Sequence, residues 1–233
     1  MLNNYERSVY MNYRHEWKHE INFSDLIILR QRLRAVAKID ENAANGKYEI
    51  RSLYFDNPAD KVLREKIDGV NMREKFRIRL YNHDVSLIHL EKKSKYNGLC
   101  RKEIAELSVW EAQAIAGGQY EWMADSKREL VIELYCKMMQ QGLRPRTIVD
   151  YMREPFVYGP GNVRVTLDYN IRTGLRCTDI LDQDCITVPA PGDPIILEVK
   201  WDAYLPSVIR DAVQLQGRRT AAFSKYAAGR VWG

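Results

Sequence analysis

The sequence lacks long hydrophobic runs. No apolar stretch approaches the roughly 18 residues that a membrane-spanning helix needs, and the N-terminus lacks the apolar core of a signal peptide. We therefore expect a cytoplasmic protein with no membrane segment of its own. Any transport of a product across a membrane would then need a membrane-protein partner.

Cysteine is scarce as well. The chain holds four cysteines, which are far apart and form no C-x-x-C pair: Cys100, Cys136, Cys177 and Cys185. This spacing is not that of a disulfide framework or a zinc site, so we expect reduced thiols. Internal repeats and low-complexity segments are also missing, which excludes solenoid and fibrous classes.

The composition is that of an ordinary globular protein, with 233 residues, 45% hydrophobic and 29% charged. We predict a single domain over residues 1–233, in which residues 1–12 form a loose polar lead-in and residues 108–141 a helical insert. The formal net charge of +5 permits an anionic partner without requiring one. The positions of the basic residues therefore matter more than their total.

Residues 72–81, MREKFRIRLY, alternate with a period of two, which predicts a half-buried strand. Neighbours on one face of a strand lie about 7 Å apart, so a row of like charges there needs water or an anion to screen it. This face is either a solvated outer surface or the wall of an anion site. Its basic side chains are Arg73, Lys75, Arg77 and Arg79.

The rest of the chain mixes further strands with amphipathic helices, an α+β order. Apolar residues at helical spacing predict the helices, and alternation predicts the strands. The helices are expected at 26–37, 59–68, 109–116, 126–141 and 205–214. The strands are expected at 13–21, 47–55, 85–93, 100–107, 145–154, 162–171 and 194–201.

At least five of these strands carry ionic residues on one face. That repetition favours a closed β-barrel with charge lining its interior and apolar sides packed outward against helices. A barrel filled with arginine and lysine must hold water and an anion. Arginine's planar fork matches phosphate oxygens, and the few glutamates suit a divalent metal, so we expect a polyphosphate chain with such an ion.

Short motifs on these strands occur in an order that resembles a known family, the VTC (vacuolar transporter chaperone) domain. That domain is the polyphosphate polymerase branch of the CYTH-like triphosphate tunnel metalloenzymes. The resemblance runs from about Tyr13 to Tyr226. Its motifs are Arg14-x-Glu16-x-Lys18, Arg77-x-Arg79, Glu91-x-Lys93, Glu198-x-Lys200 and Ser224-Lys225-Tyr226.

The resemblance implies an eight-stranded antiparallel tunnel, closed as a barrel, that binds ATP and inorganic polyphosphate. It further implies transfer of the terminal phosphoryl group of ATP to a growing chain, with Mn²⁺ or Mg²⁺. The residues it assigns to catalysis are Lys18, Arg77, Arg79, Lys93, Arg153 and Glu198. Those expected to bind phosphate are Arg14, Arg51, Lys75, Lys102, Tyr151, Arg164, Lys200, Ser224 and Lys225.

Some roles stay open at this point. Glu198 is the expected metal ligand, and Glu16 either joins it or only neutralises neighbouring cations. Asp168 either pairs with Arg164 or binds metal. Either Arg101 or Lys102 matches the family position on its strand.

One departure from the wider superfamily bears on the activity. Its usual first motif is Glu-x-Glu-x-Lys, whereas this chain has Arg14 at the first position. The lost carboxylate disfavours a triphosphatase or a cyclase and agrees with the polymerase branch. The alternatives are a triphosphatase of the same fold and a non-catalytic polyphosphate or nucleotide-binding module. Nucleic acid is not expected as a partner, because the strands lack an aromatic stacking platform. Metal preference, product length and oligomeric state are not determined by the sequence.

Overall fold

A single curled antiparallel sheet forms the centre of the computed structural model, which describes residues 14–215, 217 and 223–230. The predicted lead-in, residues 1–12, lies outside the described residues. Each predicted strand corresponds to one strand of the sheet, and two short strands, β2 (Lys38–Ile39) and β9 (Val188–Pro189), pair with β7 and β8. The order is β1 (His15–Ile21), β10 (Ile195–Trp201), β8 (Val163–Thr173), β7 (Arg144–Tyr158), β3 (Tyr48–Asp56), β4 (Arg73–Tyr81), β5 (Asp84–Tyr96) and β6 (Leu99–Leu107).

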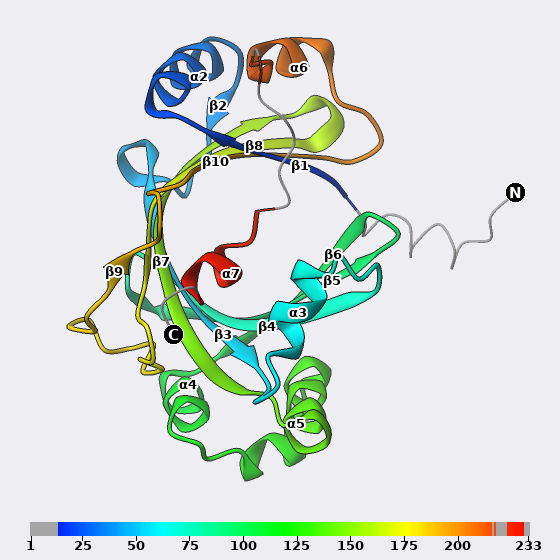
Figure 1. Ribbon diagram of the computed structural model, residues 1–233, viewed down its shortest axis with the longest axis vertical. Helices are drawn as coiled ribbons and strands as arrows, with labels where there is room; N and C mark the ends of the chain where they lie inside the picture. The colour runs from blue at the N-terminus through cyan, green and yellow to red at the C-terminus, as the bar shows by residue number, and fades with distance from the viewer. Residues whose placement is uncertain (1–13, 216, 218–222, 231–233) are drawn as a thin grey trace, which may run out of the picture.

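The sheet curls into a half-barrel that stays open, so the predicted closed barrel is wrong (Figure 1). Closure would need β1 and β6 to pair along their length. Among the described residues these two edges meet at one isolated bridge, where Arg14 and Cys100 exchange backbone hydrogen bonds of 3.2 and 3.4 Å. Alternation could not reveal this difference, because a strand shows the same two faces in a curled sheet and in a closed one.

Two helices cover the outer face over β8 and β10 (Figure 1). Helix α2 (Phe23–Val36) begins with a capping box, in which Asn22 and Asp25 each accept the other's backbone N–H, and α6 (Ser207–Val213) packs beside it. Leu29 and Leu33 of α2 are fully buried against the apolar side of the sheet. The predicted outward packing of helices is therefore correct here.

The predicted helical insert covers the outer face over β4 to β6. It consists of α4 (Val109–Ala116), the 3-10 turn η2 (Glu121–Asp125) and α5 (Glu129–Gln141). Their buried side chains share one apolar cluster with the even-numbered residues Phe76 and Ile78 of β4. The basic residues of β4 therefore point the other way, to the concave side.

Two short helices lie on the concave side, α3 (Lys61–Ile67) and α7 (Lys225–Gly229), and α7 sits inside the curl (Figure 1). Tyr226 of α7 belongs to a third apolar cluster, with Ile50 and Tyr151 of the sheet. Part of the concave side is thus apolar, which the sequence did not predict. Two 3-10 turns, η1 (Ala44–Gly46) and η3 (Pro160–Asn162), complete the elements. None of the helices within the described ranges is long and apolar enough to cross a membrane.

Candidate functional site

A cavity of about 570 Å³ opens on the concave side of the sheet, lined by strands together with α3, α7 and the residues just before α7. With the exception of Arg51, it gathers every residue that the sequence assigned to the site. These residues are Arg14, Glu16, Lys18, Lys75, Arg77, Arg79, Lys93, Lys102, Tyr151, Arg153, Arg164, Glu198, Lys200, Ser224 and Lys225.

Arg51 does not line the cavity, so its assignment to phosphate binding is corrected. It lies on the opposite face of β3, where its Nε and Nη2 donate to the two carboxylate oxygens of Asp150 at 3.0 and 2.9 Å. Its remaining nitrogen donates to the backbone carbonyl of Asp182. Only 4% of Arg51 is exposed, so these contacts make it a structural residue.

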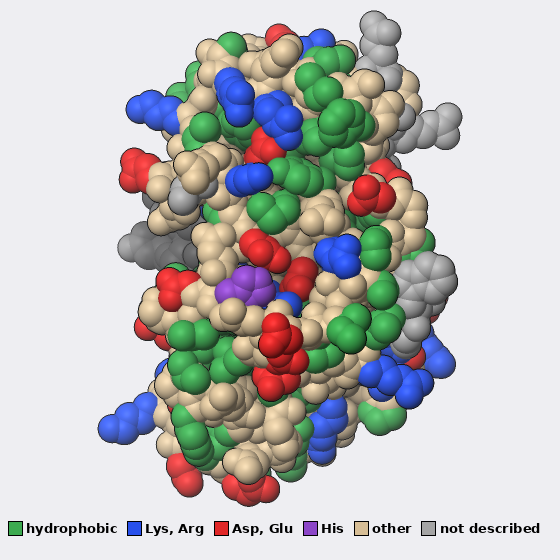
Figure 2. All heavy atoms as spheres, turned by 90° about the vertical axis from the view of Figure 1, so that its left-hand side faces the viewer, with side chains coloured by type: hydrophobic (Ala, Val, Ile, Leu, Met, Phe, Trp, Pro, Cys, Tyr) green, Lys and Arg blue, Asp and Glu red, His purple; other side chains and the backbone are tan. Residues whose placement is uncertain are grey.

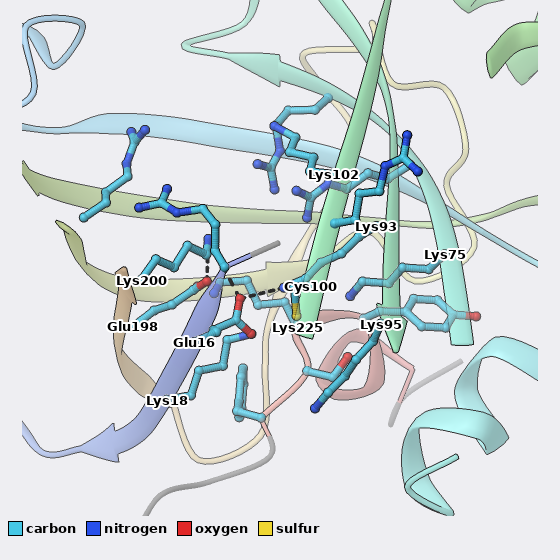
Figure 3. A pocket seen from close by; sticks show the side chains of 18 of the residues that line it. Glu16, Lys18, Lys75, Lys93, Lys95, Cys100, Lys102, Glu198, Lys200 and Lys225 are labelled. Atoms are coloured by element: carbon cyan, nitrogen blue, oxygen red, sulfur yellow. Dashed lines mark hydrogen bonds and ion pairs between the residues drawn. The ribbon is translucent and has the colours of Figure 1, made fainter. Parts of the chain in front are cut away.

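Glu16 and Glu198 approach each other across the paired strands β1 and β10 (Figure 3). Glu16 lies 2.8 Å from the Lys18 Nζ and 2.6 Å from the Lys93 Nζ, and Glu198 lies 2.6 Å from the Lys200 Nζ. Burial alone raises the pKa of Glu16, and Glu198 raises it further, but the three ammonium groups lower it to about 2. Burial likewise opposes ionisation of Glu198, yet Lys18 and Lys200 hold its pKa well below the usual range. Both carboxylates are therefore charged at neutral pH.

A second cluster surrounds Glu91, which is 1% exposed. Its carboxylate lies 2.5 Å from the guanidinium of Arg77, 2.5 Å from the Lys102 Nζ and 3.6 Å from the guanidinium of Arg79. Arg79 also donates to the Tyr151 hydroxyl at 3.0 Å. Burial raises the pKa of Glu91, but Arg77 and Arg79 outweigh it and the pKa falls well below its usual range. The carboxylate thus fixes the direction of both guanidinium groups.

Asp168 forms the third cluster, with partners other than the predicted Arg164. Arg153 donates to both of its carboxylate oxygens at 2.7 Å, and the Lys225 Nζ lies 2.5 Å from Oδ2. Arg164 instead pairs with Asp40 at 2.8 Å. Asp168 is fully buried, and these contacts join β7, β8 and the start of α7.

Three lysines of the cavity form no ion pair within the described part of the chain: Lys66, Lys75 and Lys95. Burial, together with neighbouring cations, lowers the pKa of Lys75 to about 7 and that of Lys66 to about 8. The Lys75 Nζ lies over the Tyr54 ring, 5.3 Å from its centroid. Lys66 and Lys95 were not predicted as site residues, although Lys95 lies two positions after Lys93 and therefore on the same face of β5. A bound anion would therefore favour the protonated, ammonium forms of Lys66 and Lys75.

Glu16 and Glu198 are the residues that could hold a divalent ion. Magnesium in proteins is usually bound by one or two carboxylates plus phosphate oxygens of the substrate, and this donor set fits two ionised carboxylates in a basic cavity. Across the described ranges, three or more acidic, histidine or cysteine side chains do not gather into a closed metal site. A metal here would therefore need ligands from a bound phosphate.

The chain thus folds into a half-barrel, and the concave side of this half-barrel holds a cationic cavity with a few ionised carboxylates. The chain belongs to the VTC domain family, whose model matches residues 13–231. The predicted family is therefore confirmed over nearly the whole chain. No curated protein matches the sequence.

Several solved structures are similar at low identity. The PH1012 protein of Pyrococcus horikoshii OT3 is 16% identical, with 91% of this chain and 96% of that chain covered and a TM-score of 0.48. A Bacillus halodurans protein provisionally described as an adenylate cyclase is 13% identical, with coverages of 80% and 81% and a TM-score of 0.49. The capping enzyme triphosphatase of Mimivirus is 11% identical, with coverages of 86% and 85% and a TM-score of 0.42.

Proposed function

We propose that the protein is a polyphosphate polymerase, which transfers the γ-phosphoryl group of ATP to the end of an inorganic polyphosphate chain. One observation carries the proposal: basic side chains from strands far apart in sequence converge on one cavity that also holds Glu16 and Glu198 (Figure 3). Phosphoryl transfer needs little covalent work from the protein, so positioned charges can supply most of the catalysis.

In this proposal the guanidinium groups of Arg77 and Arg79 hold the γ-phosphate. Glu91 supports this role, because it contacts both guanidinium groups and so limits their movement, while both arginines line the cavity. Lys18, Lys93 and Arg153 bind oxygens of the adjoining phosphates. Each also touches a carboxylate, so the site keeps its geometry before phosphate arrives.

The remaining cations extend the same path. Lys102, Arg164, Lys200 and Lys225 would bind phosphates of the acceptor chain, together with Arg14, Lys75, Tyr151 and Ser224. Glu198, with Glu16, would hold a Mn²⁺ or Mg²⁺ ion. When bound, that ion would offset charge on adjacent phosphates.

The test is an incubation of the purified chain with ATP and Mn²⁺, resolved on a gel stained for polyphosphate while ADP and free phosphate are counted. The proposal predicts long chains and one ADP per phosphate incorporated. Arg79→Ala should lower turnover by about 100-fold or more, the usual cost of removing one positioned donor. Arg34→Ala, an exposed residue of α2, serves as the matched control.

Other products would point to other functions. Free phosphate without chains would indicate the triphosphatase, in which water replaces the acceptor chain. Tight binding without turnover would indicate a binding module. Wild-type turnover of Arg79→Ala would contradict the assignment of the cavity.

A further inference from the structure

Residues 174–187 join β8 to β9 and lie outside the curl of the sheet (Figure 1). Ile180, in the middle of this segment, is fully buried in the apolar cluster that also holds Ile148 of β7. The Arg51 guanidinium donates to the backbone carbonyl of Asp182. The middle of the segment is therefore held against the sheet.

Two cysteines meet at the base of this segment. Cys177 and Cys185 are free thiols, and each is half-buried against the same apolar cluster. An ideal Cβ placed on Gly174 would lie 3.4 Å from the Cys177 Cβ and 3.3 Å from the Cys185 Sγ. The Cys177 backbone N–H also donates to the Gly174 carbonyl at 2.8 Å. The two cysteine side chains thus share the space that a larger residue at position 174 would fill.

The other contacts of the two thiols are weak. The Cys177 Sγ lies 4.0 Å from the Asp179 carbonyl oxygen, and the Cys185 Sγ lies 3.9 Å from the Ile186 carbonyl oxygen. A thiol is a poor hydrogen-bond donor, so turning either side chain gives up little. Seven residues separate the two cysteines in the sequence, a spacing that does not by itself indicate a pair. The fold is what brings them together.

We propose that Cys177 and Cys185 form a reversible disulfide that closes residues 178–184 into a loop. The oxidant is a small disulfide of the glutathione class. The Cys177 thiolate attacks one sulfur of this oxidant, whose S–S bond breaks, and one glutathione thiolate leaves. The Cys185 thiol then loses its proton and attacks the Cys177 sulfur, which releases the second glutathione. The two released thiolates take up the two protons that the cysteines lose, so two thiols are oxidised and one disulfide is reduced.

The surroundings of Cys185 give the order of these steps. Burial, followed by the Cys177 side chain, raises the pKa of the Cys185 thiol from 9.0 to about 12, although Arg51 acts in the opposite direction. Cys185 is therefore protonated at neutral pH, and only a thiolate attacks a disulfide. This is why Cys177 attacks first and Cys185 completes the bond, in a step that should become faster as the pH rises.

The test is an equilibrium titration of the full chain in glutathione buffers, followed by alkylation of the remaining thiols and peptide mapping without reduction. The proposal predicts a peptide pair linked through Cys177 and Cys185, lighter than the dithiol form by two hydrogen atoms. The same titration in urea provides the unfolded reference. Folding should raise the equilibrium constant for this disulfide at least about tenfold, because the fold already holds the two side chains together.

The remaining cysteines provide the matched control. Cys100 lines the cavity, and Cys136 is exposed on α5. Cys100→Ser/Cys136→Ser should form the link as the wild type does, whereas Cys177→Ser should leave Cys185 free or joined to glutathione.

Three results would overturn the proposal. They are glutathione adducts without the linked peptides, preferential links to Cys100 or Cys136, and an equilibrium constant equal to that in urea. None of these measurements uses ATP, so the disulfide and the polymerase are tested separately.

Discussion

A single buried carboxylate, that of Asp168, holds two cations that come from distant parts of the chain. Arg153 and Lys225 both contact it, and Glu198 lies 3.8 Å from Arg153. Burial raises the pKa of Asp168, but Arg153 and Lys225 lower it to about 2. Without Asp168, two buried positive charges would face each other with less compensation.

Asp168→Asn should therefore lower the free energy of unfolding by about 3–5 kcal/mol, the cost of breaking a buried pair. Chemical denaturation measures this change. Added tripolyphosphate should stabilise the variant more than the wild type, because the anion can take the place of the carboxylate. Asp211→Asn, in an exposed pair, should cost no more than about 1 kcal/mol. Equal losses for the two variants would contradict the role of Asp168.

Lys75 gives the cavity a pH dependence. Burial, with Arg77, Lys93 and Lys18 nearby, lowers its pKa from 10.5 to about 7, although Tyr54 acts in the opposite direction. The folded protein then binds fewer protons than the unfolded chain between these values, so this group makes the free energy of unfolding rise with pH there.

Phosphate binding should reverse that shift. A bound anion favours the ammonium form, so the protein takes up protons at pH 8 as it binds tripolyphosphate. The dissociation constant should rise with pH above about 7, by up to roughly tenfold per pH unit for each proton taken up. Calorimetry in two buffers of different ionisation enthalpy measures the uptake. Lys75→Gln should reduce it; an unchanged uptake would show that other groups carry the effect.

Arg51 shows where prediction from charge fails. Arg51 lies on the same face of β3 as Leu53 and Phe55, which are buried on the outer side of the sheet. The positive charge alone then suggested a phosphate ligand. Asp150, its partner, lies on the neighbouring strand, and only the strand register brings the two together. For a basic residue on a strand, the face on which it lies thus predicts a phosphate-binding role better than its charge does.

At the scale of elements, the position of α7 depends on a close approach of its backbone to the sheet at Gly229. A side-chain Cβ at Gly229 would lie 2.8 Å from Cγ2 of Val149 and 3.4 Å from Oγ1 of Thr173. The Gly229 carbonyl accepts a hydrogen bond of 2.8 Å from the Thr173 hydroxyl. A larger residue would push α7 away and move Lys225 from Asp168.

Gly229→Ala should lower the free energy of unfolding by about 1–3 kcal/mol, the usual cost of overpacking, and, if the proposed function is correct, should also reduce turnover of ATP. Thermal denaturation and the ATP assay measure the two effects. Gly159→Ala is the matched control, because a Cβ there meets nothing within 4 Å and should not destabilise. Equal changes in unfolding free energy and in turnover for the two variants would contradict a role for the close packing of α7 against the sheet.

Alternation in the strands predicted most of the cavity, whereas the helices on the concave side could not be placed. Lys66 lies on α3, and nothing in a helical pattern indicates which side of a curled sheet the helix will occupy. The same holds for α7, whose apolar contacts fill part of the concave side. Closure of the sheet into a barrel could also not be predicted from the sequence, because it depends on whether β1 and β6 run side by side.

At the scale of the whole molecule, the two surfaces differ in charge. The outer face mixes basic, acidic and apolar side chains, as Figure 2 shows for one side. The lining of the cavity instead holds far more lysines and arginines than carboxylates. An excess charge confined to a concave space favours anions that fit inside it.

A flexible polyphosphate chain should therefore bind in competition with tripolyphosphate, and a single-stranded oligonucleotide should not. Proteins that bind single-stranded nucleic acid usually stack its bases on accessible aromatic side chains, whereas the tyrosines of this cavity lie inside the curl. Displacement of labelled tripolyphosphate measures both competitors at one salt concentration. Equal displacement by the oligonucleotide would contradict a site selective for polyphosphate.

Phosphorus-31 NMR of ATP with Mg²⁺ and the protein tests the central claim most directly, because it follows every phosphate in one sample. The proposal predicts that the γ-phosphate signal of ATP falls while signals of ADP and of internal chain phosphates rise in equal amounts. Conversion of the γ-phosphate to inorganic phosphate alone, or an unchanged ATP spectrum, would contradict a polymerase.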